Sequence, residues 1–494
     1  MLKKLTSPPT PLELTETVNQ LVEGLSGLDA SQVTFLPPDG MEAQTVQQAL
    51  SETFISVAEG KALLETAVSD KGGTVSKQGE TATFQELAQG VGTIPQESEP
   101  SLPTPQQIYE ETRPRDWLPM PEPQDNEMYL LFHILKGSSA LLAFSVTCTG
   151  EYTVTLGTVK DGRFVEKSSS KHASAAVYTA KLYAADYGDF TSDGTAQVMI
   201  KVSGQDITKW TTGNHPQKPY TYNHPGWNVV EVSCRLPKVS TLQFGNYQSP
   251  RLRIQYAAVK GSTRLTGSGF LFWNCKELKT ILELDMSKFY SFPAFDGCSS
   301  LLVCPEMKVS GVVSASSLFS DCTSLLYFPT LYCQGFRSTY GMFDGCYNLR
   351  QAPSYDFSQP QDAAYMFQNC NSLEEAPSMD TSQTTGMQYM FSNCNALKVI
   401  PNLDISRVTN MGSIFYNCYA LESLKLSAKD GVASPQPIDL SACNFMREGL
   451  VELFKSLPPI SSSATITLEG NPGVTDLTSA DKAIAAGKGW TLAL

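Results

Sequence analysis

The stretch Met390–Leu397 reads Met-Phe-Ser-Asn-Cys-Asn-Ala-Leu, and its pattern Phe-x-x-Cys-x-x-Leu returns at nearly constant intervals through the second half of the chain. Seven copies follow one another, at one interval of 23 residues and five of 24 residues. The repeated aromatic and cysteine positions are Phe272, Cys275, Phe295, Cys298, Phe319, Cys322, Phe343, Cys346, Phe367, Cys370, Phe391, Cys394, Phe415 and Cys418. Because one such unit cannot bury its own apolar residues, we expect the units to stack as coils of a solenoid, with Phe, Cys and Leu ladders as its core.

Each copy also indicates how its coil is folded. The piece Leu-x-x-apolar-Pro, as in Leu397–Pro401, predicts a short strand that ends at the proline. The piece Met-Phe-x-x-Cys predicts a turn of helix on the opposite side of the coil, capped by a following Asp-x-Ser turn. Seven equivalent thiols cannot all pair within one stack, so we interpret the cysteines as small buried side chains and not as a disulfide ladder.

The combination of Met-Phe-x-x-Cys-x-x-Leu with Asp-x-Ser-x-Val-Thr-Asn-Met resembles the BspA-like leucine-rich repeats. Asp404–Met411 matches the second motif closely, Asp380–Met387 matches it in part, and residues 356–363 depart from it. The resemblance covers about a third of the chain. It implies a leucine-rich-repeat-like solenoid over residues 263–425 and, because members of the family are mostly surface-exposed and adhesive, recognition of a surface ligand.

Residues 426–494 lose the period and predict an α/β cap for the last coil, which would otherwise expose its apolar face. An amphipathic helix is expected over Arg447–Leu457, and the alternation in Ala464–Leu468 predicts a strand. A second helix begins at Thr478 with capping-box spacing and ends at Gly487.

The first half of the chain predicts three further parts. Residues 126–262 alternate between apolar and polar residues in short runs separated by turn residues, which predicts a β-sandwich. Residues 97–125 hold seven prolines and predict an extended, semi-rigid linker. Residues 1–96 predict a mainly helical module, so the chain is expected to be multidomain.

Heptad-like apolar spacing in residues 14–25 and 50–68 of that module fits two arrangements. One is a coiled coil that makes the protein a homo-oligomer, expected as a trimer in a fibre, and the other is a pair of amphipathic helices packed within a monomer. The segment Gly60–Ile94 resembles the N-terminal attachment region of bacteriophage tail fibre and baseplate proteins. That resemblance implies docking to other tail or baseplate proteins through the N-terminus.

Composition excludes several classes of partner and reaction. A net charge of −13 argues against nucleic acid and anionic membranes as partners. The sequence has no run of 18 apolar residues, so we expect no membrane insertion, and the N-terminus lacks the pattern of a secretory signal. We find no motif of a catalytic site and no metal-ligand spacing, so no enzyme activity, cofactor or metal is expected. A polysaccharide depolymerase acting through two carboxylates is the weaker alternative.

Two functions therefore compete. The favoured one is a virion tail fibre or baseplate appendage, made in the host cytoplasm, whose repeats bind a host surface protein or glycan; the alternative is a bacterial surface adhesin. The residues after each ladder leucine vary freely in charge and size, which fits either a recognition surface on a rigid scaffold or solvated positions that are free to drift; we favour the recognition surface. The candidate receptor-binding residues are Tyr327, Arg350, Gln351, Glu374, Glu375, Lys398 and Glu422. A second candidate is a group of aromatic residues in the expected sandwich, Trp210, Tyr220, Tyr222 and Trp227.

Overall fold

A computed structural model describes one compact unit that begins at Pro103. Its described residues are 103–494 except 213–227, 245–252, 262–264, 266–270, 285–293, 306, 309–313, 328–330, 333–335, 353–359, 430, 432 and 435. The helical module predicted for residues 1–96, with its heptads and its attachment motif, lies outside the described residues.

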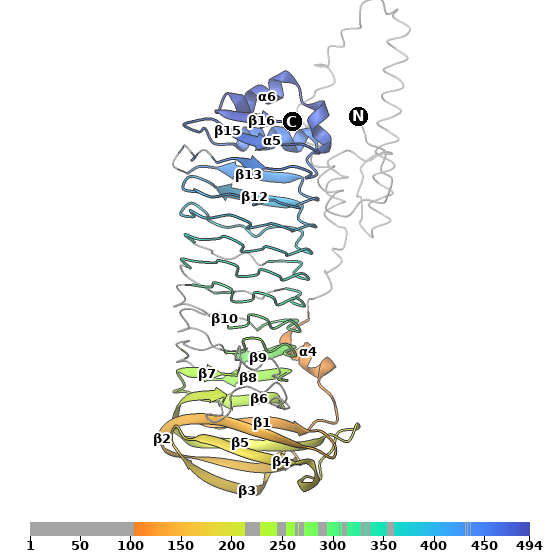
Figure 1. The fold of residues 1–494 in the computed structure, drawn as a ribbon, viewed down its shortest axis with the longest axis vertical. Helices are drawn as coiled ribbons and strands as arrows, with labels where there is room; N and C mark the ends of the chain where they lie inside the picture. The colour runs from red at the N-terminus through yellow and green to blue at the C-terminus, as the bar shows by residue number, and fades with distance from the viewer. Residues whose placement is uncertain are drawn as a thin grey trace, which may run out of the picture. The chain divides into compact units, whose positions relative to one another are not determined.

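The unit consists of a sheet, a stack of coils and a small α/β cap (Figure 1). The sheet region holds the helix α4 (Pro105–Thr112), the 3-10 turn η1 (Ala184–Asp186) and the strands β1 (Glu127–Ile134), β2 (Ser139–Lys160), β3 (Arg163–Ala173), β4 (Val177–Tyr183), β5 (Ala196–Thr212), β6 (Val229–Arg235), β7 (Thr241–Gln243), β8 (Tyr256–Lys260) and β9 (Thr280–Leu284). The coils carry β10 (Met307–Lys308), β11 (Leu331–Tyr332), β12 (Val399–Asp404) and β13 (Ser423–Ser427). The cap holds β14 (Ile438–Asp439), α5 (Arg447–Ser456), β15 (Ala464–Thr467), η2 (Pro472–Asp476), α6 (Ser479–Ala486) and β16 (Trp490–Ala493).

The sheet runs into the coils without a break. Its strand order is β3-β2-β5-β1-β6-β8-β9, with β4 paired to β2 and β7 paired to β5. The strands from β3 to β6 pair antiparallel, whereas β6, β8 and β9 pair parallel, and Thr280 of β9 forms the next parallel bridge with Val303. The predicted β-sandwich is therefore not supported: its strands exist, but they form one sheet that continues as the wall of the solenoid.

The described part of the expected linker, residues 103–125, belongs to this fold. Thr104 and Gln107 form a capping box at the start of α4, and Arg113 holds the carboxylate of buried Glu231 at 2.8 Å. Residues 103–125, which we name the strap, also bring Trp117 and Leu118 against one face of β1. The other face of β1 packs in the main core, so the strand is buried on both sides. The prediction of extended chain over 97–125 is thus wrong for residues 105–112.

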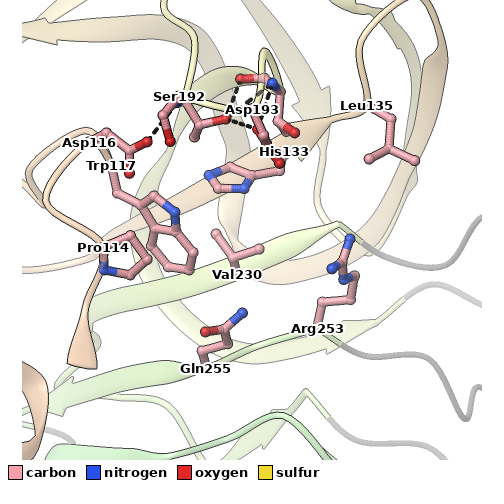
Figure 2. Close-up of a pocket in the computed structure, with 12 residues that line it drawn as sticks. Pro114, Asp116, Trp117, His133, Leu135, Ser192, Asp193, Val230, Arg253 and Gln255 are labelled. Atoms are coloured by element: carbon pink, nitrogen blue, oxygen red, sulfur yellow. Dashed lines mark hydrogen bonds between the residues drawn. The ribbon is translucent and has the colours of Figure 1, made fainter.

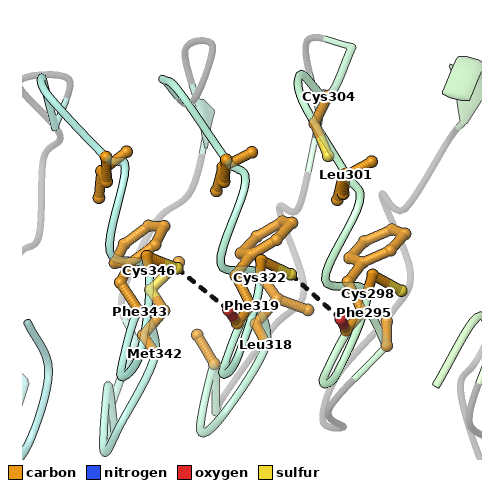
Figure 3. Packing of buried hydrophobic residues seen from close by; sticks show 14 of the residues in the cluster. Phe295, Cys298, Leu301, Cys304, Leu318, Phe319, Cys322, Met342, Phe343 and Cys346 are labelled. Atoms are coloured by element: carbon orange, nitrogen blue, oxygen red, sulfur yellow. Dashed lines mark hydrogen bonds between the residues drawn. The ribbon is translucent and has the colours of Figure 1, made fainter. Parts of the chain in front are cut away.

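The predicted ladders form the core of a solenoid of about eight turns. Every ladder phenylalanine and cysteine is buried, and the rings of successive coils stack at centroid distances of 5.1–6.4 Å (Figure 3). The stack begins before the first repeat, because Phe244 lies 5.3 Å from Phe272 and nearly parallel to it. Sheet and solenoid therefore share one hydrophobic core.

The segment around each ladder phenylalanine is a tight turn and not the helix that we expected. Its backbone bonds to the next coil, as in a sheet: the N–H of Phe391 donates to Ile414, and the N–H of Asn393 donates to Tyr416. Two residues four positions apart adopt left-handed backbone, for example Tyr389 at φ 58° and Asn393 at φ 62°. Since a right-handed helix admits no such residues, the coil folds sharply around its phenylalanine.

The cap agrees with the sequence. Helix α5 buries Leu450, Leu453 and Phe454, and α6 begins at the predicted capping box of Thr478 and Asp481. Strand β15 lies where the alternation predicted it, between β14 and β16. These elements cover the end of the core beyond β13 (Figure 1).

Candidate functional site

The residues that we predicted to bind a receptor lie in one column along the solenoid. Parallel bridges join Tyr327 to Gln351, Gln351 to Glu375 and Glu375 to Val399. A neighbouring row of backbone hydrogen bonds connects Arg350, Glu374, Lys398 and Glu422 in the same order. This charged column continues the parallel strands of the sheet, so the scaffold does hold the predicted residues side by side.

Two features make the charged column a weaker candidate for ligand binding. The hydroxyl of Tyr327 donates to the carbonyl oxygen of Pro103, so the strap of the same chain contacts this residue. Farther along, positive and negative side chains alternate between coils, and Lys398 pairs with Glu374 at 3.3 Å although both side chains are more than half exposed. An exposed pair of this kind contributes little energy and largely cancels its own field.

A second surface, which the sequence analysis missed, lies on the turn around each ladder phenylalanine. We name it the tyrosine turn; it consists of Tyr340, Tyr347, Tyr365, Tyr389, Tyr416 and Tyr419. All six stand between three residues before and four residues after a ladder phenylalanine, so the stacking of the coils places them on the same side of the solenoid. Tyr416 and Tyr419 are 57% and 55% exposed, among the largest values for bulky apolar residues in the described chain.

Contacts between neighbouring coils hold the tyrosine turn rigidly. The Tyr365 and Tyr389 rings stack with centroids 5.1 Å apart. A ladder of amides runs beside them, in which Asn393 donates to Asn369 and Asn417 donates to Asn393, each at 2.8 Å. The hydroxyl of Tyr419 in turn donates to Asn417 at 2.6 Å. The aromatic side chains therefore rest on a backbone whose conformation is fixed before any ligand arrives.

The aromatic cluster that we proposed in the sheet region is not a surface. Trp210 is only 1% exposed and stacks on Phe144 at 4.3 Å, as part of the core. Tyr220, Tyr222 and Trp227 lie outside the described residues.

Within the described residues, no three His, Cys, Asp or Glu side chains are grouped as metal ligands would be. In that part of the chain, no helix has the length and apolar character that crossing a membrane requires.

Comparison with known proteins supports the repeat and nothing outside it. A family model described as Mycoplasma protein of unknown function, DUF285, matches residues 313–428. No curated protein matches the chain. The matched residues are the regular coils from Ser314 to the end of β13, and together with the solenoid they fit a BspA-like repeat protein.

Proposed function

We propose that this protein is an adhesin-like surface protein that binds a macromolecule on a cell surface through the tyrosine turn. The observation that carries the proposal is the gathering of six tyrosines, five of them 36–57% exposed, on the same segment of successive coils. Exposed aromatic groups cost solubility, and contiguous ones on a folded surface mark interaction sites. The BspA-like resemblance points to the same class of function.

Tyrosine is well suited to this role. Its ring contributes a large contact area at a small loss of side-chain entropy, and its hydroxyl supplies a hydrogen bond, so interfaces are enriched in it. The stacked rings and the amide ladder lower the cost further, because the side chains are already ordered. By contrast, exposed pairs of opposite charge such as Lys398–Glu374 leave the charged column with little net field to attract a ligand.

The experiment compares adhesion of the fluorescent full-length chain to epithelial and bacterial cells, before and after Tyr389→Ser, Tyr416→Ser and Tyr419→Ser are combined. Aromatic anchors typically contribute more than about 1.4 kcal/mol each, so we expect at least a tenfold loss of affinity. Tyr183→Ser is the matched control, because Tyr183 is 48% exposed on β4, away from the coils. Charge reversal at Arg350 and Lys398 tests the charged column in the same assay.

Three results would contradict the proposal. The first is a wild-type chain that adheres to none of the cells, and the second is a triple variant that retains full adhesion while its melting temperature is unchanged. The third is loss of adhesion on charge reversal alone, which would transfer the function to the charged column.

The tail-fibre hypothesis is the narrower form of this proposal. It depends on the resemblance of residues 60–94 to phage attachment regions, and it places the same binding surface on a virion. Mass spectrometry of purified particles tests it directly: the chain is a virion protein if it co-purifies with particles at constant stoichiometry, and an adhesin of the bacterium if it fractionates with cell envelopes.

A further inference from the structure

A pocket of about 300 Å³ lies where the strap meets the sheet (Figure 2). The strap contributes Asp116 and Trp117, β1 contributes His133, and the turn before β5 contributes Asp193. Arg253 and Gln255, just ahead of β8, form the opposite wall. The strap is held in place by Gln197, whose amide donates to the carbonyl of Asp116 and accepts the N–H of Leu118, each at 2.8 Å.

His133 is the central group of this pocket. It is only 8% exposed, and its buried Nε2 has no hydrogen-bond partner within the described residues. The edge of Trp117 fixes the ring, with the two centroids 4.8 Å apart. A buried polar atom without a partner destabilises a fold, so one that borders a cavity is a reason to expect a ligand there.

The charge state of the pocket follows from its surroundings. Burial, reinforced by Arg253, lowers the pKa of His133 to about 4, so the ring is neutral at pH 7 and offers one donor and one acceptor. The N–H of Ser192 donates to Asp116 at 2.6 Å, and Asp193 accepts the hydroxyl of Thr191 and, at 3.0 Å, the N–H of Thr195. These bonds lower the pKa of both carboxyl groups, which therefore remain ionised acceptors with lone pairs to spare.

The lining thus combines acceptors on one side with donors on the other. Two carboxylates against one guanidinium, which already pairs with Glu277 at 3.5 Å, disfavour phosphate, sulfate or an acidic sugar. A neutral polyhydroxylated ligand suits it better, because each hydroxyl both donates and accepts. The volume is at the small end of the range for ligand pockets, about 300–1,000 Å³, which suits one or two rings.

We propose that this pocket binds a neutral saccharide, with hydroxyls hydrogen-bonded to Asp116, Asp193 and Arg253 and one hydroxyl completing the bonding of His133 Nε2. The site belongs to the sheet and the strap, so it is separate from the tyrosine turn on the coils. It gives the protein a second binding function, selective for glycans.

The test is saturation-transfer NMR and calorimetry on the full chain with glucose, galactose, mannose, N-acetylglucosamine and their disaccharides. We expect at least one to bind, and His133→Phe to weaken it tenfold or more, since phenylalanine keeps the ring shape but lacks the nitrogen. Asp193→Asn is the second variant, in case His133→Phe perturbs folding, and it should weaken the same sugar. His172→Phe on β3 and the triple tyrosine variant are controls that should leave sugar binding unchanged.

The outcomes separate the two proposals. Sugar binding that is lost in His133→Phe but kept in the tyrosine variant supports the pocket, whatever the fate of cell adhesion. The inference is overturned if no sugar of the panel binds, if binding survives both pocket variants, or if free neutral amino acids occupy the pocket and the sugars do not.

Discussion

The thiol of Cys394 donates a hydrogen bond to the carbonyl oxygen of Phe367 in the preceding coil, at an Sγ–O distance of 3.0 Å. The same oxygen also accepts the backbone N–H of Cys370 in its own coil at 3.1 Å. Equivalent thiol–carbonyl bonds recur from Cys298 to Cys418, two of them visible in Figure 3. Cysteine is small enough for the crowded core and still supplies a donor to each buried carbonyl, which explains why this position repeats cysteine and not alanine or valine.

This hydrogen bond predicts which of two substitutions at Cys394 destabilises the protein more. Cys394→Ala removes both volume and donor, and should lower the free energy of unfolding by about 1–2 kcal/mol. Cys394→Ser keeps a donor toward Phe367 and should lose less. Urea unfolding of the two variants measures the difference, with exposed Asn395→Ala as the control that changes nothing. If serine proves less stable than alanine, the thiol serves only as an apolar filler.

Phe244 connects the core of the sheet to that of the solenoid, and its removal should make the two parts unfold separately. Its ring lies between Trp210, 6.5 Å away, and Phe272, 5.3 Å away. Phe244→Ala should cost about 3–5 kcal/mol through the cavity that it leaves. Because coils interact only with their neighbours, we expect calorimetry to show two separate unfolding transitions in place of one. Phe190→Ala is the control, since Phe190 is 50% exposed; a single, merely lowered transition in Phe244→Ala would show that the two parts unfold together by other contacts.

The interior of the solenoid was predictable from sequence because the same buried residue types recur at a nearly fixed interval along the chain. A fixed interval of 24 residues brings equivalent side chains to equivalent places, so Phe391 and Cys394 could be assigned to the core without knowledge of the coil's path. The turn conformation was missed although its signal was present. The position two after each ladder phenylalanine holds only Asn, Gly or Asp, the residues that tolerate left-handed backbone.

The strap and its pocket were missed for a different reason. The proline count of residues 97–125 suggested a linker, whereas Thr104 followed by Pro105 and Gln107 is a helix start of the kind recognised elsewhere in this chain. The pocket has no local pattern at all. Its walls come from five segments that the sheet brings together, and only the pairing of β1 with β5 and β6, and of β6 with β8, places His133 beside Asp193 and Arg253.

The left-handed backbone at Asn393 should tolerate substitution by glycine better than substitution by alanine. Glycine occupies the same position at Gly297 and Gly345, with φ of 74° and 76°. Asn393→Gly should therefore lose only the two amide-ladder bonds of Asn393, about 1 kcal/mol for each net hydrogen bond. Asn393→Ala loses the same bonds and adds left-handed strain of roughly 1–2 kcal/mol. Equal unfolding free energies for the two variants would show that the turn relaxes when its asparagine is removed.

His133 should make the stability of the sheet depend on pH. Burial and the neighbouring Arg253 lower its folded-state pKa to about 4, while Asp193, the side chain of Gln197 and Asp116 oppose that shift. An unfolded histidine titrates near 6.5, so as the pH falls the unfolded chain takes up this proton first. The stabilising effect is thus fully present above about pH 6.5 and is lost progressively toward pH 4.

The comparison of wild type with His133→Phe isolates this effect, because the carboxyl groups common to both chains cancel. Between pH 7 and pH 4.5 the wild type should lose about 2–3 kcal/mol more unfolding free energy than the variant. Urea titrations at several pH values measure both slopes. Parallel curves would mean that His133 is protonated as easily in the folded chain as in the unfolded one, and that its Nε2 is in contact with water. A bound saccharide should steepen the dependence of the wild-type unfolding free energy on pH further. Once Nε2 is protonated it can no longer accept a hydrogen bond from the sugar hydroxyl, so binding and the stability that it adds are lost together.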